Sequence, residues 1–163
     1  MSGIDADQSP APTGSIVVGH DGSDYANHAL AVALDLAEPL GASVVVVRAW
    51  SIDTAPRPAD WKFGYVSPLT DYAGAVREKL EADARPTAAQ HPGVPIEYRA
   101  AYATPLSCLI NVSREARMLV VGSRGRGGLA GMLLGSVSEQ CVRHAACPVL
   151  VCGPPTEPET AWA

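Results

Sequence analysis

The chain has 163 residues, 47% of them hydrophobic, which fits one globular domain with a core of its own and is too short for two domains of ordinary size. Its net charge of −5 argues against a nucleic-acid partner, because binding a phosphate backbone needs a broad basic surface. No apolar run approaches the ~20 residues of a membrane-spanning helix, and the first residues lack the basic and apolar regions of a signal peptide. We therefore expect a cytoplasmic protein with no membrane partner.

The first half of the chain predicts two strand–helix pairs behind a lead segment. Residues 1–14 hold two prolines and little apolar surface, which predicts a flexible lead. Ser23 is suited to cap the first helix, and Gly41 is suited to close it. The predicted elements are a strand at 15–20, a helix at 24–40, a strand at 43–50, and a helix at 71–90 that Pro86 kinks or divides.

A long segment, 51–70, separates the second strand from the second helix. It contains three prolines and the aromatic residues Trp61, Phe63 and Tyr65. Connections of this length in compact domains are often lids or lack fixed structure. Together with Trp50, these aromatic side chains could fold over a bound base or only anchor the loop, and the sequence leaves both interpretations open.

The second half of the chain predicts three more strands and two more helices. Thr104 as N-cap and Pro105 at the first helical position begin one helix. Ser136 and Glu139 have the spacing of a capping box at the start of the other. The predicted strands lie at 94–102, 118–123 and 149–152, and the last helix runs from 136 to about 146. The tail, 153–163, has three prolines and is predicted to be disordered.

Strands that alternate with helices predict a single-domain, three-layer α/β/α sandwich with a five-stranded parallel sheet over residues 15–152. Ligands of such folds bind beyond the carboxyl ends of the strands, where the strand order reverses. The loops of interest are therefore those that follow Gly19, Ala49, Tyr102 and Val121.

The loop after the fourth predicted strand carries the strongest functional signal. Gly122, Gly125 and Gly135 followed by Ser136 spell G-x2-G-x9-G-S between a buried strand and a helix start. Backbone N–H groups free of bulky side chains beside a helix N-terminus bind anions such as a triphosphate. The pattern is neither a Walker A motif nor a dinucleotide fingerprint. It predicts a nucleotide phosphate site.

Two residues at the end of the first strand have more than one interpretation. Asp21 could contact a ligand at the carboxyl end of the strand, or it could satisfy the backbone amides of a turn. His20 has no Ser or Cys partner at a catalytic spacing, which favours a structural histidine. The other histidines do not cluster as metal ligands, and the four cysteines lack metal-binding spacing, so we expect buried free thiols.

These segments resemble the universal stress protein family, whose ATP-binding members carry the same glycine–serine motif. The likeness covers nearly all of residues 15–152 and is carried by the segments 17–23, 120–125, 134–137 and 147–151. The resemblance implies a Rossmann-like fold of the adenine nucleotide alpha hydrolase type. It also implies that ATP binds with Mg²⁺ or Mn²⁺ bridging its phosphates.

The resemblance also implies a role for each candidate site residue. Asp21, next to Gly19, faces the nucleoside, and a main-chain group of Ala49 meets the adenine edge. The phosphate contacts come from Gly125, Gly135, Ser136 and Val137, with Gly122 near the ribose. The rest of the candidate set lies in the same loop and comprises Val121, Ser123, Gly127 and Gly128, together with Arg124 and Arg126, whose contact we infer from their charge.

The resemblance has one local departure and one implication for assembly. Ala103 stands where the family often has glycine, so a methyl group lies beside the nucleoside side of the pocket and could tighten the fit or narrow the opening. The family pairs its last strand across a twofold axis, which implies a homodimer through strand 149–152. An edge strand left open would need such a cover.

The leading hypothesis is an ATP-binding regulator of the stress response, in which nucleotide occupancy changes the surface that an unidentified partner protein meets. The enzymatic alternative is slow ATP hydrolysis or autophosphorylation at Ser123, Ser136 or Ser138, since no base that positions water is evident. Binding of AMP or cyclic AMP is a further alternative, as is a structural dimer whose motif is vestigial.

Overall fold

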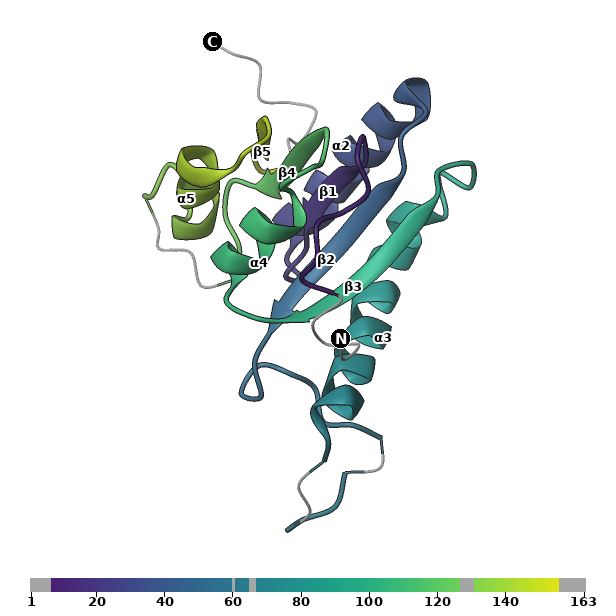
Figure 1. Cartoon of the computed structure of the whole chain (residues 1–163), viewed down its shortest axis with the longest axis vertical. Coiled ribbons are helices and arrows are strands. Elements are labelled where there is room, and N and C mark those ends of the chain that lie inside the picture. Colours follow the sequence, from purple (N-terminus) through teal and green to yellow (C-terminus); the bar gives the residue numbers. More distant parts are fainter. Residues whose placement is uncertain (1–6, 60, 65–66, 127–130, 156–163) are drawn as a thin grey trace.

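The computed structural model describes residues 7–59, 61–64, 67–126 and 131–155. Its centre is one parallel sheet in the order β3-β2-β1-β4-β5 (Figure 1). The strands are β1 (Ile16–Gly19), β2 (Val44–Trp50), β3 (Ile96–Tyr102), β4 (Met118–Gly122) and β5 (Val149–Cys152). The prediction of five parallel strands is confirmed.

Helices cover both faces of this sheet, as the alternating pattern predicts. They are α2 (Asp24–Leu40), α3 (Leu69–Ala88), α4 (Pro105–Val112) and α5 (Ser136–His144). Along β2, Val44 and Val46 join the core under α2 and α3, whereas Val45 and Val47 join the core under α4 and α5. Both faces of the strand are therefore buried, and the three-layer sandwich is confirmed (Figure 1).

The strand order places the predicted ligand loops side by side. The chain runs from β1 outward through β2 to β3, then returns to the other side of β1 as β4. The order therefore reverses between β1 and β4, which is the position where such folds bind ligands. The β1–α2 turn and the loop after β4 meet at this switch point.

Two local predictions about helices need correction. Gly135, not Ser136, is the N-cap of α5, and its backbone N–H donates to the Ser123 carbonyl at 2.6 Å, which fixes the cap one residue earlier. Glu139 pairs with Arg143 at 2.9 Å, so no capping box forms. Helix α3 continues two residues past Pro86, so the alternative in which Pro86 divides the helix is wrong.

Residues 7–14 lie against the body of the protein, although the sequence predicts a flexible lead there. The Ala11 amide donates to the Val112 carbonyl at 2.8 Å. The Asp7 carboxylate accepts from the Ala100 amide of β3 at 3.1 Å and pairs with Arg77 at 2.6 Å. This buried carboxylate covers part of the outer edge of β3. Residues 1–6 and 156–163, the ends of the predicted lead and tail, lie outside the described residues.

Within the described part of the chain, none of the helices combines the length and the apolar character needed to cross a bilayer.

Candidate functional site

The site is built where the turn after β1 meets the loop after β4. Asp21 Oδ2 accepts the backbone N–H of Arg126 at 2.8 Å, and Oδ1 accepts that of Ser23 at 3.0 Å. Partial desolvation raises the pKa of the Asp21 carboxyl, but the hydrogen bonds from Ser23 and from the Arg126 amide outweigh it and lower the pKa below its usual value. An ionised Asp21 therefore ties the two loops together.

The absence of side chains at two glycines permits this close approach. A Cβ on Gly125 would collide with the Asp21 carboxylate. Gly22 has φ +88°, and a Cβ there would lie 2.6 Å from Nη2 of Arg126. Gly125 therefore leaves room for the Asp21 carboxylate, and the positive φ at position 22 favours glycine in the turn.

We call residues 122–136, between β4 and α5, the glycine loop. Its other contacts anchor it to the ends of β4 and α5. The Ser123 carbonyl accepts from the Gly135 amide at 2.6 Å and from the Ser138 hydroxyl at 3.2 Å. The Arg124 guanidinium donates to the Met132 carbonyl, so in this conformation Arg124 links the two sides of the loop. The predicted residues Gly127 and Gly128 lie outside the described residues.

The remaining predicted residues occupy the strand and helix ends around this loop. Val121 is buried in β4, and Gly122 follows it where a Cβ would lie 2.8 Å from Cβ of Tyr25. Ser136 is exposed in the first turn of α5. The others pack against the core beneath α4 and α5: Gly19 at the end of β1, Ala49 near the end of β2, Val137 in α5 and Ala103 after β3.

The charge of the loop suits an anion. Residues 122–136 include two arginines and no acidic residue, and α5 begins at Ser136 with the exposed amides of a helix N-terminus. Among the described residues, no carboxylate pairs with the guanidinium of Arg126. The charge of this side favours an anionic group, while the ionised Asp21 favours a group that donates hydrogen bonds.

Metal-binding side chains do not gather at this site. Over the ranges that the structure describes, no three residues among His, Cys, Asp and Glu form a group that could hold a metal ion.

Sequence reasoning missed a buried polar network beneath the β1–α2 turn. It joins His20 to Asn27 of α2, to Arg48 of β2 and, through Arg48, to Asp83 of α3. His20 is satisfied by these partners, in agreement with the structural interpretation of that residue. The signal in the sequence was Arg48, a charged residue at the end of the apolar run 44–47 in a strand predicted to be buried on both faces.

The aromatic residues near segment 51–64 divide into two groups. Trp50 is 3% exposed; it stacks on Tyr72 at 6.3 Å between ring centroids and packs in a tilted arrangement against Tyr102 at 4.9 Å, so it anchors the segment. Phe63 is 96% exposed, and the segment extends past the N-terminal end of α3 (Figure 1). Tyr65 lies outside the described residues.

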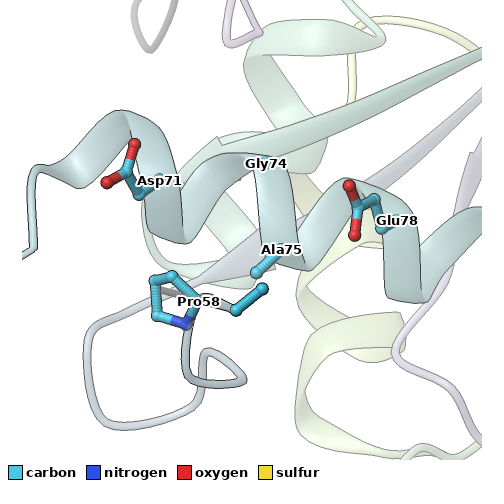
Figure 2. A pocket seen from close by; sticks show the side chains of 6 residues that line it. Pro58, Asp71, Gly74, Ala75 and Glu78 are labelled. Atoms are coloured by element: carbon cyan, nitrogen blue, oxygen red, sulfur yellow. The ribbon is translucent and has the colours of Figure 1, made fainter. Parts of the chain in front are cut away.

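Two hollows lie away from the Asp21–Arg126 contact. One, of about 210 Å³, lies between α3 and segment 51–64, with Pro58 facing Gly74 and Ala75 between the carboxylates of Asp71 and Glu78 (Figure 2). The other, of about 400 Å³, adjoins the start of α5 and is lined by Met132, Leu133, Leu134 and Glu139. Only the second borders the glycine loop.

Comparison with known proteins points to one family. The model of the Universal stress protein family matches residues 13–153. Universal stress protein Rv2005c of Mycobacterium tuberculosis is 36% identical over 141 residues, which cover 83% of this chain and 44% of the relative. The chain thus spans less than half the length of the curated relatives it matches.

Solved structures agree with this result. A universal stress protein crystallised in complex with cAMP is 26% identical and has a TM-score of 0.60, covering 85% of this chain and 95% of that one. The protein UspA from Lactobacillus plantarum shares the fold at 21% identity and a TM-score of 0.59, with 87% and 99% of the two chains covered.

Proposed function

The chain belongs to the universal stress protein family, and from this premise we propose that it binds an adenine nucleotide at the switch point between β1 and β4 and acts as a nucleotide-dependent regulator of the stress response. The observation that carries the proposal is the convergence of Asp21 with the backbone of Gly125 and Arg126, at the edge where such folds bind ligands. A cytoplasmic location is part of the same proposal.

The nucleotide we propose first is ATP with Mg²⁺ or Mn²⁺. The donor set supports it, because the amides of the Gly125 and Gly135 regions, the start of α5 and Arg126 supply positive potential for several phosphates. Asp21 would repel a bare phosphate, so its place is beside the nucleoside hydroxyl groups. The cation would neutralise phosphate charge and hold the chain of phosphates in one conformation.

Cyclic AMP is the second candidate, and one observation favours it. The structural relative in complex with cAMP covers most of this chain at 26% identity. A ligand with a single phosphate would use the Asp21 side of the site and fewer of the loop amides. It should then bind with less dependence on Arg126 and on a divalent cation.

Turnover of ATP is the less favoured activity. Ser123 and Ser138 are 8% and 3% exposed, and the Ser138 hydroxyl donates to two carbonyls, so neither is open to a phosphate. Ser136 is exposed and is the remaining acceptor among the three. Mass spectrometry after incubation with ATP would detect a phosphate at Ser136, and a Ser136→Ala variant is the matched control.

The decisive experiment is calorimetry of the purified protein with ATP, AMP and cyclic AMP, each with and without Mg²⁺. We expect ATP with Mg²⁺ to bind most tightly and a Gly135→Asp variant to lose at least about tenfold in affinity, since an added carboxylate repels phosphate. Gly93→Asp, far from the loop, is the control. Equal binding of wild type and Gly135→Asp, or no binding of any of the three ligands, would reject the proposed site.

We also propose that β5 pairs with a second copy of the chain. It pairs only with β4 among the described strands, and Leu150 is 36% exposed on it. Val142 of α5, 54% exposed, extends the apolar surface on the helix that packs beside this strand. Light scattering should report a dimer for the wild type and a monomer for Leu150→Lys, whereas Leu40→Lys on α2 should leave the dimer intact.

A further inference from the structure

The polar network beneath the β1–α2 turn is a cluster of buried polar and charged side chains that the proposed function does not use. His20 is 2% exposed, yet it receives or gives a hydrogen bond at both ring nitrogens. Its partners come from three directions: the turn itself, α2 and β2. Polar groups this deeply buried are costly unless fully paired, so the arrangement calls for a physical reason.

The hydrogen bonds define the protonation state of His20. Nδ1 lies 3.1 Å from the Gly22 amide and 3.0 Å from Nη2 of Arg48, and both of these groups can only donate. Nδ1 is therefore an acceptor without a proton. Nε2 carries the proton and donates to Oδ1 of Asn27 at 2.9 Å. The imidazole is neutral in this arrangement.

Arg48 holds the same residue by a second contact. Its Nε donates to the His20 carbonyl at 2.9 Å, so Arg48 grips both the ring and the backbone of His20. The charge of Arg48 is balanced by Asp83 of α3 at 2.9 Å, and Asp83 is also paired with Lys79 at 2.6 Å. The contacts of Arg48 are thereby anchored to α3.

The clamped turn is the one that presents Asp21 to the glycine loop. Asp21 lies between His20, which Arg48 holds, and Gly22, whose amide the His20 ring holds. Nη2 of Arg48 lies 3.3 Å from the position that a Gly22 Cβ would take, and Nη2 of Arg126 lies 2.6 Å from it. The two guanidinium groups therefore flank the same turn, one from the sheet and one from the loop.

The groups that face His20 set the sign of its response to acid. Burial lowers the pKa of His20, the hydrogen bond to Asn27 opposes this, Arg48 lowers the pKa further, and Asp21 and Asp83 raise it, with a lowered pKa as the net result. Protonation at Nδ1 would place an N–H against the two donors, Gly22 and Arg48. The turn would then lose both bonds at once.

We propose that Arg48 and His20 are positioning residues for the nucleotide site: they fix the turn that presents Asp21 to the glycine loop, and a proton on His20 releases that turn. The effect on nucleotide affinity rests on the function proposed above. The effect on the turn does not, because it concerns only contacts within the chain.

The first test needs no nucleotide. Amide hydrogen exchange of Gly22 and Arg126, followed by NMR and corrected for intrinsic rates, should show protection that falls at least about tenfold as the pH is lowered from about 7.5 to about 5. His20→Asn places an amide oxygen where Nδ1 lies and cannot take up a proton in this range, so its protection should not change with pH. The same pH dependence in wild type and His20→Asn would overturn the proposal.

The second test measures affinity. Arg48→Met should weaken the binding of ATP with Mg²⁺ about tenfold, Arg48→Lys should restore part of it, and Arg77→Met should change it less than about twofold. Arg77 is a matched control, because its ion pair with Asp7 lies outside the network. Asp83 keeps Lys79 as a partner in Arg48→Met, so no buried carboxylate is left bare.

The outcomes separate the two proposals. If the wild type binds none of the adenine nucleotides, the proposed function fails, and amide exchange alone decides the role of Arg48 and His20. Unchanged protection at Gly22 and Arg126 in Arg48→Met overturns the positioning role. Protection lost uniformly over the whole sheet overturns it as well, because Arg48 would then only support the fold.

Discussion

Two segments follow neighbouring strands of the sheet and differ in how firmly they are held. The turn after β1 is fixed from the sheet by Arg48 and tied by Asp21 to the loop after β4. The segment after β2 is anchored by Trp50 and extends past the N-terminal end of α3 (Figure 1), and Phe63 within it is 96% exposed. The difference shows that the centre of the sheet, where both neighbouring strands supply partners, is where a site can be preformed.

The largest expected effect on stability is at Trp50, where the segment after β2 begins. Trp50→Ala removes a ring packed against Tyr72 and Tyr102 and should lower the free energy of unfolding by about 3–5 kcal/mol. Trp50→Phe is the matched control and should cost far less, because among the described residues the indole N–H has no hydrogen-bond partner to lose. Urea denaturation measures both. Similar losses in the two variants would mean that the indole ring is held by more than packing.

The second largest effect is expected at the contact between the two central loops. Gly125→Ala places a methyl group against the Asp21 carboxylate, which must shift, and we expect the Asp21–Arg126 hydrogen bond to be lost. We expect the free energy of unfolding to fall by about 1–3 kcal/mol, as for other overpacked sites, and ATP affinity to fall at least tenfold or about 1.4 kcal/mol. Gly93→Ala is the control, because a Cβ there has no atom within 4 Å. Equal stability and affinity in both variants would show that the turn after β1 and the loop after β4 are held as loosely as the segment after β2.

How far the sequence predicted this arrangement follows from the range of the interactions involved. Strands, helices and the parallel sheet depend on local periodicity and on alternation of elements, and these were readable in runs such as 44–47 and 24–40. The glycine motif was readable because it is continuous in sequence. Its placement opposite Asp21 followed from the switch-point rule alone.

Interactions between side chains distant in sequence were not readable. Arg48 and Asp83 lie 35 residues apart, and Asp7 meets the Ala100 amide across 93 residues. No periodic pattern links such pairs, so neither the clamp on His20 nor the packing of residues 7–14 could be inferred. The cap of α5 was misplaced by one residue, because the partner of the Gly135 amide is the carbonyl of Ser123, at the other end of the loop.

The reaction rates of the cysteine thiols measure how often the core under α4 and α5 opens. Burial raises the pKa of Cys108 to about 12 and that of Cys141 to about 11. At about pH 8 both should react with a thiol reagent at least about tenfold more slowly than the partly exposed Cys147. Mass spectrometry of the labelled protein identifies the order. Equal rates at the three positions would mean that the core under α4 and α5 opens readily.

The same pKa values fix the sign of an alkaline effect. Because the thiols of the unfolded chain ionise near pH 9 while those of Cys108 and Cys141 stay protonated until about pH 11–12, stability is retained below about pH 9 and falls as the pH rises above it. Thermal melting at about pH 8 and about pH 10 measures the fall. A Cys108→Ala variant should lose less stability over this interval than the wild type, and an equal loss would contradict the assignment to this thiol.

The smallest effect is expected at Phe63, in the segment after β2. Phe63→Ser should change the free energy of unfolding by less than about 0.5 kcal/mol, because a side chain that is 96% exposed loses almost nothing when it is truncated. ATP affinity distinguishes the two interpretations of the aromatic residues. It stays unchanged if the segment is only anchored by Trp50, and it falls if Phe63 folds over the base once the nucleotide is bound. A fall in affinity with unchanged stability would reverse the comparison: Phe63, exposed in the free protein, would contact the ligand, and the preformed turn after β1 would be only half of the site.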